Sequence, residues 1–248
     1  MKGVITAAGL GTRSGLNGRL RKELLPIYLK LGGDIVLRPI MDAVYSRMVD
    51  HGVNDIAIIL NPGDEITHSY IRANLPDATI LHQERQRGFG DAVLQAREFI
   101  DGDDFLLNAG DGIILNDTAY STGLEIHRKT GSAVLFLMRV EDPKRYGVAE
   151  VLQQEGYMIV ESVEEKPSKP KSNLAICATY IFNSEILGRI DHSIQANIEL
   201  TPAIDALTSA GRTVFAVEVQ RDEWISVGHA VDYSASLART LDMAKRSR

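Results

Sequence analysis

The sequence predicts an α/β protein built on a mostly parallel sheet, with helices on both faces and a small antiparallel extension. Three observations support this fold class. Short apolar runs end at glycine or at an Asn-Pro-Gly turn, as buried parallel strands do. Stretches with helical spacing of apolar residues lie between these runs. After about Gly131, strand-like runs follow one another with few helices between them.

The first part of the chain alternates strands with helices. The helix beginning at Pro39 places Ile40, Val44 and Met48 along one side and stops at a His-Gly pair. We expect strands at residues 3–8, 55–60, 78–82 and 105–109, and helices at residues 39–50 and 90–100. Such alternation is typical of a parallel sheet covered on both faces.

The second part of the chain is richer in consecutive strands. We expect strands at residues 132–140, 147–152, 157–164, 174–182 and 213–219, and helices at residues 200–210 and 230–245. The neighbouring strands indicate an antiparallel extension that forms a lid or platform. Because no repeat or Pro/Ser-rich linker interrupts the chain, we expect one domain over residues 1–248 with two functional parts, about 1–130 and 131–248.

Composition excludes several classes of protein. With 248 residues, 44% of them apolar and 24% charged, the chain can fold as one globular α/β domain. A formal charge of −6 argues against nucleic-acid or anionic-membrane partners. The single cysteine, Cys177, excludes an internal disulfide and a Cys-rich zinc site. No apolar stretch reaches the roughly 18–20 residues that span a bilayer, and the N-terminus turns glycine-rich too early for a signal peptide. We expect a cytoplasmic protein, and the sequence is compatible with a homo-oligomer.

A glycine-rich turn follows the first expected strand. It runs through Ala8, Gly9, Leu10, Gly11, Thr12, Arg13, Ser14 and Gly15. Glycines there let backbone N–H groups approach an anion closely. A dinucleotide fingerprint needs a third glycine or alanine where Ser14 stands, and an arginine inside that loop is unusual. The Gly-Lys-Ser/Thr of a Walker loop is absent. A tight turn with no ligand is the remaining alternative.

Two cations favour a ligand at this turn. Arg13 lies within it, and Lys22 follows shortly after. Both lie near the carboxyl end of a strand, where open α/β sheets bind ligands. The pair suits a polyphosphate, although Lys22 taken alone reads as a solvated lysine.

Three later side chains have suitable chemistry and an ordinary structural alternative each. Asp111 ends an apolar strand, where it is either a turn aspartate or a ligand for a hard cation such as Mg²⁺. Gln83 either ends a strand or reads the edge of a base through its amide. Lys166 either pairs with Glu164 or Glu165, or binds a phosphate as a point charge.

The segments described above occur in the order seen in one family of enzymes. The chain resembles the sugar-1-phosphate nucleotidylyltransferases, most closely the glucose-1-phosphate uridylyl- and thymidylyltransferase branch. The matching segments are residues 7–13, 22–26, 83–92, 110–111, 145–148 and 164–167. This resemblance implies a GT-A-like, Rossmann-related fold that transfers a nucleotidyl group from UTP or dTTP to a sugar 1-phosphate and releases pyrophosphate.

The resemblance also implies roles for individual residues. It assigns Arg13 and Lys22 to catalysis at the triphosphate, and Asp111 to Mg²⁺. The nucleotide-binding residues would be Ala8, Gly9, Gly11, Thr12, Gln83 and Gly88, and the sugar-phosphate-binding residues Gly147, Glu165 and Lys166. The part at 1–130 would bind the nucleotide, and the part at 131–248, with the C-terminal helix, the sugar phosphate.

One departure from the family pattern concerns the metal. The resemblance implies a second metal-binding aspartate two residues after Trp224, where this chain has Ser226. Either Asp111 and the phosphates hold the metal alone, or Asp222 or Glu223 substitutes, or catalysis is impaired. Two alternatives therefore stay open: a nucleotide or NDP-sugar sensor on the same fold, and a cytidylyl- or guanylyltransferase with another phosphorylated acceptor.

Overall fold

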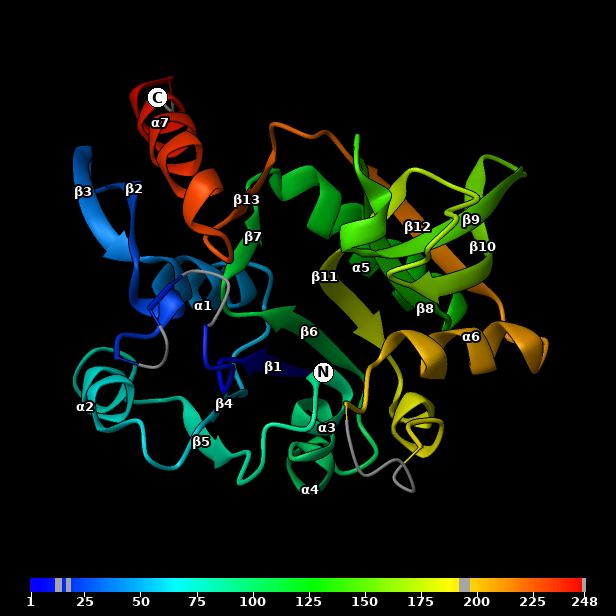
Figure 1. The fold of residues 1–248 in the computed structure, drawn as a ribbon, viewed down its shortest axis with the longest axis horizontal. Helices are drawn as coiled ribbons and strands as arrows, with labels where there is room; N and C mark the ends of the chain where they lie inside the picture. The colour runs from blue at the N-terminus through cyan, green and yellow to red at the C-terminus, as the bar shows by residue number, and fades with distance from the viewer. Residues whose placement is uncertain (12–14, 17–18, 192–196, 247–248) are drawn as a thin grey trace.

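The computed structural model of the chain describes residues 1–11, 15–16, 19–191 and 197–246. A nine-stranded sheet forms its centre, in the order β5-β4-β1-β6-β11-β8-β12-β10-β9 (Figure 1). The strands, in chain order, are β1 (Lys2–Thr6), β4 (Ile56–Leu60), β5 (Thr79–His82), β6 (Phe105–Ala109), β8 (Ala133–Arg139), β9 (Gly147–Gln154), β10 (Tyr157–Glu165), β11 (Leu174–Phe182) and β12 (Val214–Val219). The predicted strands are confirmed, with ends displaced by at most two residues.

The four neighbouring strands β5, β4, β1 and β6 at one side of the sheet are parallel. β1 lies between β4 and β6 and pairs parallel with both, and β5 pairs parallel with β4. Their carboxyl ends therefore meet at one edge of the sheet, where the glycine turn, Gln83 and Asp111 follow. The parallel half of the sheet is as the sequence predicts.

The antiparallel part begins at β11. This strand pairs antiparallel with both β6 and β8, whereas β8 and β12 pair parallel. β10 then adds antiparallel pairs with β12 and β9, which confirms the expected mixed sheet. The β11–β8 register shifts between Ile176 and Tyr180, and Ala178 has a φ of +51°. This irregularity bends the middle of β11.

Two layers of helices cover the sheet, because strand residues alternate between its faces. Ile5 faces the side covered by α1, α2 and α5, whereas Val4 faces the side covered by α3, α4 and α6. The helices are α1 (Ile40–Asp50), α2 (Glu65–Asn74), α3 (Phe89–Leu94), α4 (Arg97–Ile100), α5 (Asp117–Thr130), α6 (Thr201–Ser209) and α7 (Ala230–Arg246). Short 3₁₀ turns lie at η2 (Lys22–Leu24), η3 (Pro143–Arg145) and η4 (Ser184–Gly188).

One predicted helix is wrong in its continuity. The stretch expected as a single helix at 90–100 forms α3 and α4. At the join, the amides of Gln95 and Ala96 donate to carbonyls three residues earlier, Ala92 and Val93. This tighter turn interrupts the α-helical ladder of i to i−4 bonds.

Several elements were not predicted. A hairpin of β2 (Pro26–Leu31) and β3 (Asp34–Pro39) turns at Gly32 and Gly33, which have φ values of +58° and +96°. Two positive φ values in a two-residue loop are the reason for the glycine pair. The other helices and strands absent from the prediction are α2, α5, β7 (Gly112–Ile114) and β13 (Trp224–Ser226), and the three 3₁₀ turns were not predicted either.

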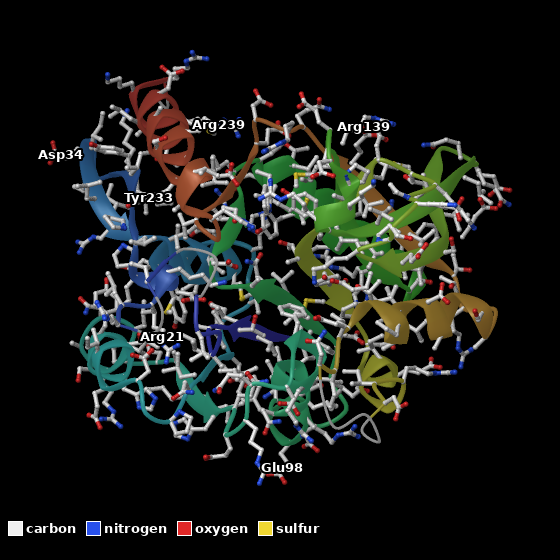
Figure 2. All side chains as sticks on the ribbon, viewed as in Figure 1. Arg21, Asp34, Glu98, Arg139, Tyr233 and Arg239 are labelled. Atoms are coloured by element: carbon white, nitrogen blue, oxygen red, sulfur yellow. The ribbon has the colours of Figure 1, made fainter. Side chains whose placement is uncertain are left out.

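The last helix packs on this N-terminal hairpin. Tyr233 Oη of α7 donates to the Pro26 carbonyl at 2.7 Å, and the Tyr28 amide donates to Thr240 Oγ1 at 3.2 Å. Figure 1 shows α7 beside β2, and Figure 2 shows Tyr233 on the hairpin side of the helix and Asp34 at the outer edge of the molecule. Segments from the two ends of the chain thus form one wall of the structure.

Candidate active site

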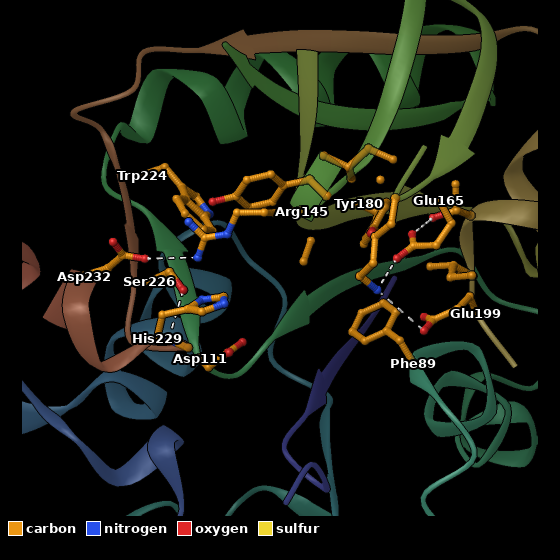
Figure 3. Close-up of a pocket in the computed structure, with 18 of the residues that line it drawn as sticks. Phe89, Asp111, Arg145, Glu165, Tyr180, Glu199, Trp224, Ser226, His229 and Asp232 are labelled. Atoms are coloured by element: carbon orange, nitrogen blue, oxygen red, sulfur yellow. Dashed lines mark hydrogen bonds and ion pairs between the residues drawn. The ribbon is translucent and has the colours of Figure 1, made fainter. Parts of the chain in front are cut away.

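A cleft opens beside the carboxyl end of β6 and the middle of the antiparallel strand β11, from which Ile176, Ala178 and Tyr180 line it. Its walls include Asp111 and Ser226 at one end and Glu165 and Lys166 at the other (Figure 3). Gly147 and Ala178 also line it, so the bend in β11 faces the cleft. Residues from both expected parts of the chain therefore surround one cavity.

Lys22 and Asp111 meet at this cleft. Lys22 Nζ lies 2.5 Å from Asp111 Oδ2, although 89 positions separate the two residues. η2 presents the lysine, and the end of β6 presents the aspartate. The structure thus brings the expected triphosphate-side cation and the expected metal ligand together.

Glu23, next to Lys22, is a buried carboxyl group that the sequence analysis missed. It is 2% exposed, and its Oε1 lies 3.8 Å from Lys22 Nζ. Burial raises the pKa of Glu23 to about 8, and the Lys22 ammonium opposes this rise. No partner of Oε2 is found among the residues that the structure describes.

The glycine turn is held by a second buried ion pair. Arg21 Nη1 donates to the Gly9 carbonyl at 2.8 Å, and Arg21 Nε donates to Asp64 Oδ2 at the same distance. The other oxygen of Asp64 accepts from the Thr67 amide at the start of α2. Arg21 is inside the molecule between the turn and α2 (Figure 2).

Part of the predicted triphosphate site is described. Ala8 is buried, Gly9 is exposed, and Gly11 has a φ of +65°, which suits glycine. Thr12 and Arg13 lie outside the described residues.

The predicted base-binding residues lie beside the same sheet edge. The backbone N–H of Gln83 donates to the Leu60 carbonyl at 2.9 Å, and the side chain of Gln83 is 3% exposed. Gly88 precedes α3 with a φ of +111°, and a Cβ there would lie 2.5 Å from the Ile198 carbonyl oxygen. Only glycine fits that position.

At the other end, Glu165 and Lys166 interact directly. Lys166 Nζ lies 2.5 Å from Glu165 Oε1 and 4.0 Å from Glu199 Oε1. Glu165 Oε2 accepts from Thr201 Oγ1 at 2.7 Å. A Cβ on Gly147 would lie 3.0 Å from both of these oxygens, so glycine keeps the corner open. The structure therefore brings together Gly147, Glu165 and Lys166, the three residues predicted to bind the sugar phosphate.

The remaining wall consists of polar and aromatic side chains. Arg145 lies 3.9 Å from Asp232, and the Arg221 guanidinium stands 5.9 Å from the centre of the Trp224 ring. His229 also lines the cleft, directly before α7 (Figure 3). The residues that sequence analysis missed around the site are Phe89, Tyr180, Glu199, Arg221 and Asp232 from the cleft lining, and Arg21, Glu23 and Asp64 behind it.

The metal site can be tested against the donors present. β13 pairs with β7, which places Ser226 opposite Gly112, next to Asp111. A Cβ on Gly228 would meet Asp111 Oδ2 at 2.8 Å and Ser226 Oγ at 3.4 Å, so both oxygens border the same small space. Within the described ranges, no cluster of three or more His, Cys, Asp or Glu side chains could hold a metal. One carboxylate and a hydroxyl fit a Mg²⁺ ion that keeps phosphate and water ligands.

The suggested substitutes for the second aspartate face elsewhere. Glu223 accepts from Asn116 Nδ2 at 2.8 Å and from the Gln220 amide at 3.0 Å. Neither Asp222 nor Glu223 is among the residues that line the cleft.

One family model matches the sequence along nearly the whole chain. The family model described as "Nucleotidyl transferase" matches residues 2–242. The chain belongs to this family. The expected resemblance and fold class are thereby confirmed, and members of this nucleotidyl transferase family generally use a divalent metal.

Curated relatives of this nucleotidyl transferase are similar over most of its length. It is 29% identical to a glucose-1-phosphate thymidylyltransferase of Streptomyces griseus, covering 94% of this chain and 64% of that one. It is 28% identical to the UTP–glucose-1-phosphate uridylyltransferase of Bacillus subtilis, covering 100% and 92%. The chain thus spans about two thirds of the first relative and nearly all of the second.

Solved structures agree with the fold. A UDP-glucose pyrophosphorylase complexed with UDP-glucose superposes with a TM-score of 0.81 at 19% identity, covering 99% of both chains. A UTP-bound UGPase from Acinetobacter baumannii gives 0.79 at 21% identity, covering 99% and 94%. None of the helices in the described ranges has the length and apolar character needed to cross a bilayer.

Proposed function

We propose that the chain transfers a nucleotidyl group from UTP or dTTP to a sugar 1-phosphate, with glucose 1-phosphate as the first candidate, and releases pyrophosphate. The observation that carries this proposal is the meeting of Lys22 and Asp111 at one end of a cleft whose other end holds Glu165 and Lys166. The substrates named for the relatives support the same assignment.

We further propose that residues 1–248 act as one domain in two parts. Residues at about 1–130 bind the nucleotide through Ala8, Gly9, Gly11, Thr12, Gln83 and Gly88. Residues at about 131–248 bind the sugar phosphate through Gly147, Glu165 and Lys166. The continuous sheet supports a single domain, because β6 and β11 from the two parts are neighbours in it. We also propose a cytoplasmic location, where the buried thiol of Cys177 would stay reduced.

The reaction we propose is an in-line displacement at the α-phosphorus. An oxygen of the sugar 1-phosphate forms a bond to that phosphorus, and the bond to the oxygen bridging the β-phosphorus breaks. Pyrophosphate leaves with that electron pair. The attacking phosphate is mostly ionised at neutral pH, since its second pKa is about 6. The reaction needs no strong general base, so positioning and charge neutralisation are the main tasks of the protein.

Each side chain of the proposed site has one role in this reaction. Lys22 and Arg13 offset charge on the α-phosphate and on the departing pyrophosphate. Lys166 holds the acceptor phosphate as a point charge, and Glu165 accepts from sugar hydroxyls. Asp111, with Ser226 beside it, is where Mg²⁺ would be held, and the ion would neutralise phosphate charge when bound.

The direct test measures pyrophosphate release with Mg²⁺, each of five nucleoside triphosphates and a panel of sugar 1-phosphates. We expect release with UTP or dTTP and a hexose 1-phosphate. Lys129→Ala serves as the control for Lys22→Ala, because Lys129 pairs only with an exposed neighbour on its own helix in the contacts described. Wild-type turnover in Lys22→Ala would remove Lys22 from the mechanism.

Ser226 favours one other function. A hydroxyl is a weaker Mg²⁺ ligand than a carboxylate, so a sensor of nucleotide or NDP-sugar would need no second acid there. Tight nucleotide binding without release from any substrate pair would support the sensor. Release only with CTP or GTP and another phosphorylated acceptor would instead assign a cytidylyl- or guanylyltransferase.

A further inference from the structure

The side-chain amide of Gln83 is held between two hydrogen-bond acceptors. Gln83 Nε2 lies 2.8 Å from Asp91 Oδ2 and 3.1 Å from the Gly88 carbonyl oxygen. A carboxylate and a carbonyl accept hydrogen bonds but cannot donate them. The NH₂ group of Gln83 must therefore face both, and its orientation is fixed by chemistry.

Asp91 is itself held in place. It is 2% exposed, and Arg87 Nη2 donates to its other oxygen, Oδ1, at 2.6 Å. Arg87 is tied to the opposite loop, since its carbonyl accepts from the Ile198 amide. Each oxygen of the carboxylate thus has its own donor, and the oxygen facing Gln83 stays an acceptor.

The other atom of the Gln83 side-chain amide, Oε1, takes no part in these two hydrogen bonds. In the part of the chain that the structure describes, no group donates to Gln83 Oε1. Gln83 follows β5 at the ligand edge of the sheet, and Phe89, directly after Gly88, lines the cleft. This edge therefore offers an incoming base a hydrogen-bond acceptor.

We propose that Asp91 is a positioning residue that sets base selectivity by keeping Gln83 Oε1 as the group that meets the base. Uracil and thymine carry a ring N–H at N3 that can donate to this oxygen. Cytosine has a lone pair at N3, and adenine has one at N1, so both would oppose the amide oxygen. This inference rests on the proposed function, in which Gln83 contacts the base.

The expected effect is a change in selectivity rather than in activity alone. A site built to hydrogen-bond a substrate N–H rejects an analogue that lacks it, because a buried polar group is then left unpaired. We expect the wild type to favour UTP over CTP by about 100-fold or more in kcat/KM. Loss of the Asp91 carboxylate should lower that ratio about 10-fold or more.

The experiment compares UTP and CTP in Asp91→Asn and Asp91→Ala. In Asp91→Asn, Arg87 still donates to the remaining oxygen, so the new NH₂ group faces Gln83 and favours the reversed amide. Gln95→Ala is the matched control, since Gln95 Nε2 donates only to the backbone carbonyl of Asp91 among the contacts described. The control should keep the wild-type ratio. A merely structural role for Asp91 would lower the rates with both nucleotides equally.

Two outcomes overturn the inference. One is a wild-type UTP/CTP ratio in both variants, with melting curves showing that they are folded. The other is a wild type that uses CTP or ATP as well as UTP, whereas use of GTP, which has an N1–H, agrees with the N–H requirement. If no substrate pair reacts at all, the proposed function fails, and calorimetric binding of UTP against CTP still tests the role of Asp91.

Discussion

Lys22 Nζ lies 2.5 Å from Asp111 Oδ2, so the cation expected to bind phosphate occupies the carboxylate expected to bind metal. Both side chains are mostly buried, which strengthens their attraction relative to a surface pair. A divalent cation at Asp111 must therefore compete with the Lys22 ammonium for that oxygen. The pair links the lysine and metal sites electrostatically.

The first prediction follows from this competition. Lys22→Met should tighten Mn²⁺ binding to the nucleotide-free protein, because it removes the competing ammonium from Asp111 Oδ2. The same variant should lower the rate of pyrophosphate release by about 100- to 1,000-fold, as loss of one electrostatic group does in other enzymes. Electron paramagnetic resonance of free Mn²⁺ and a coupled pyrophosphate assay measure the two effects. Unchanged metal affinity would show that the ion pair does not compete with metal.

The second prediction concerns Ser226. Ser226→Asp places a second carboxylate at the small space bordered by Asp111 and Gly228, so Mn²⁺ and Mg²⁺ should bind more tightly. Ser226→Ala removes the hydroxyl without adding charge and should leave metal affinity nearly unchanged. Isothermal titration with the metal alone compares the two. Equal affinities in both variants would place Ser226 outside the metal site.

The third prediction is a pH dependence of stability from Glu23. Its pKa is raised to about 8 by burial, from 4.5 for an ordinary glutamate. Between these values the folded protein holds a proton that the unfolded chain has lost. The free energy of unfolding should therefore fall as pH rises across this window, by up to about 1.4 kcal/mol per pH unit. Glu23→Gln should flatten the curve, as measured by urea denaturation from pH 5 to 8.5 in metal-free buffer. A wild-type curve that is already flat would contradict this.

The fourth prediction concerns the buried pair of Arg21 and Asp64. Arg21→Met leaves Asp64 buried without its cation and should cost about 3–5 kcal/mol of unfolding free energy. Breaking the more exposed pair of Lys2 and Asp55 with Asp55→Asn should lower the unfolding free energy much less, because water screens that pair. Denaturant titration of both variants compares them. Similar small losses would mean that the Arg21 pair adds little to the fold.

The sequence predicts the parallel half of the fold well because its strands are continuous apolar runs. Residues 56–60 are fully buried on both faces, and such a run is visible without any structure. The hairpin was missed because Leu31, Ile35 and Leu37 are exposed, so its apolar residues do not follow a regular buried face. The Gly32-Gly33 pair was the one available signal.

The site was only partly predictable for a different reason. Asp111 and Lys166 were predicted as site residues because they follow strands and match a motif. Arg21 and Glu23 were missed, since a charged residue in a loop is normally solvated and burial of a charge depends on distant partners. Asp64, 43 positions after Arg21, supplies such a partner only once β1 and β4 are paired.

Helix α7 contacts both the segment that follows Lys22 and the strand that carries Ser226. Tyr233 bonds to Pro26, four residues after Lys22, and Ser236 Oγ donates to the Ser226 carbonyl at 2.8 Å. A rotation of α7 about its axis would therefore move the segment next to Lys22 and the strand of Ser226 at the same time. A partner that bound α7 would therefore change the positions of Lys22 and Ser226 without entering the cleft.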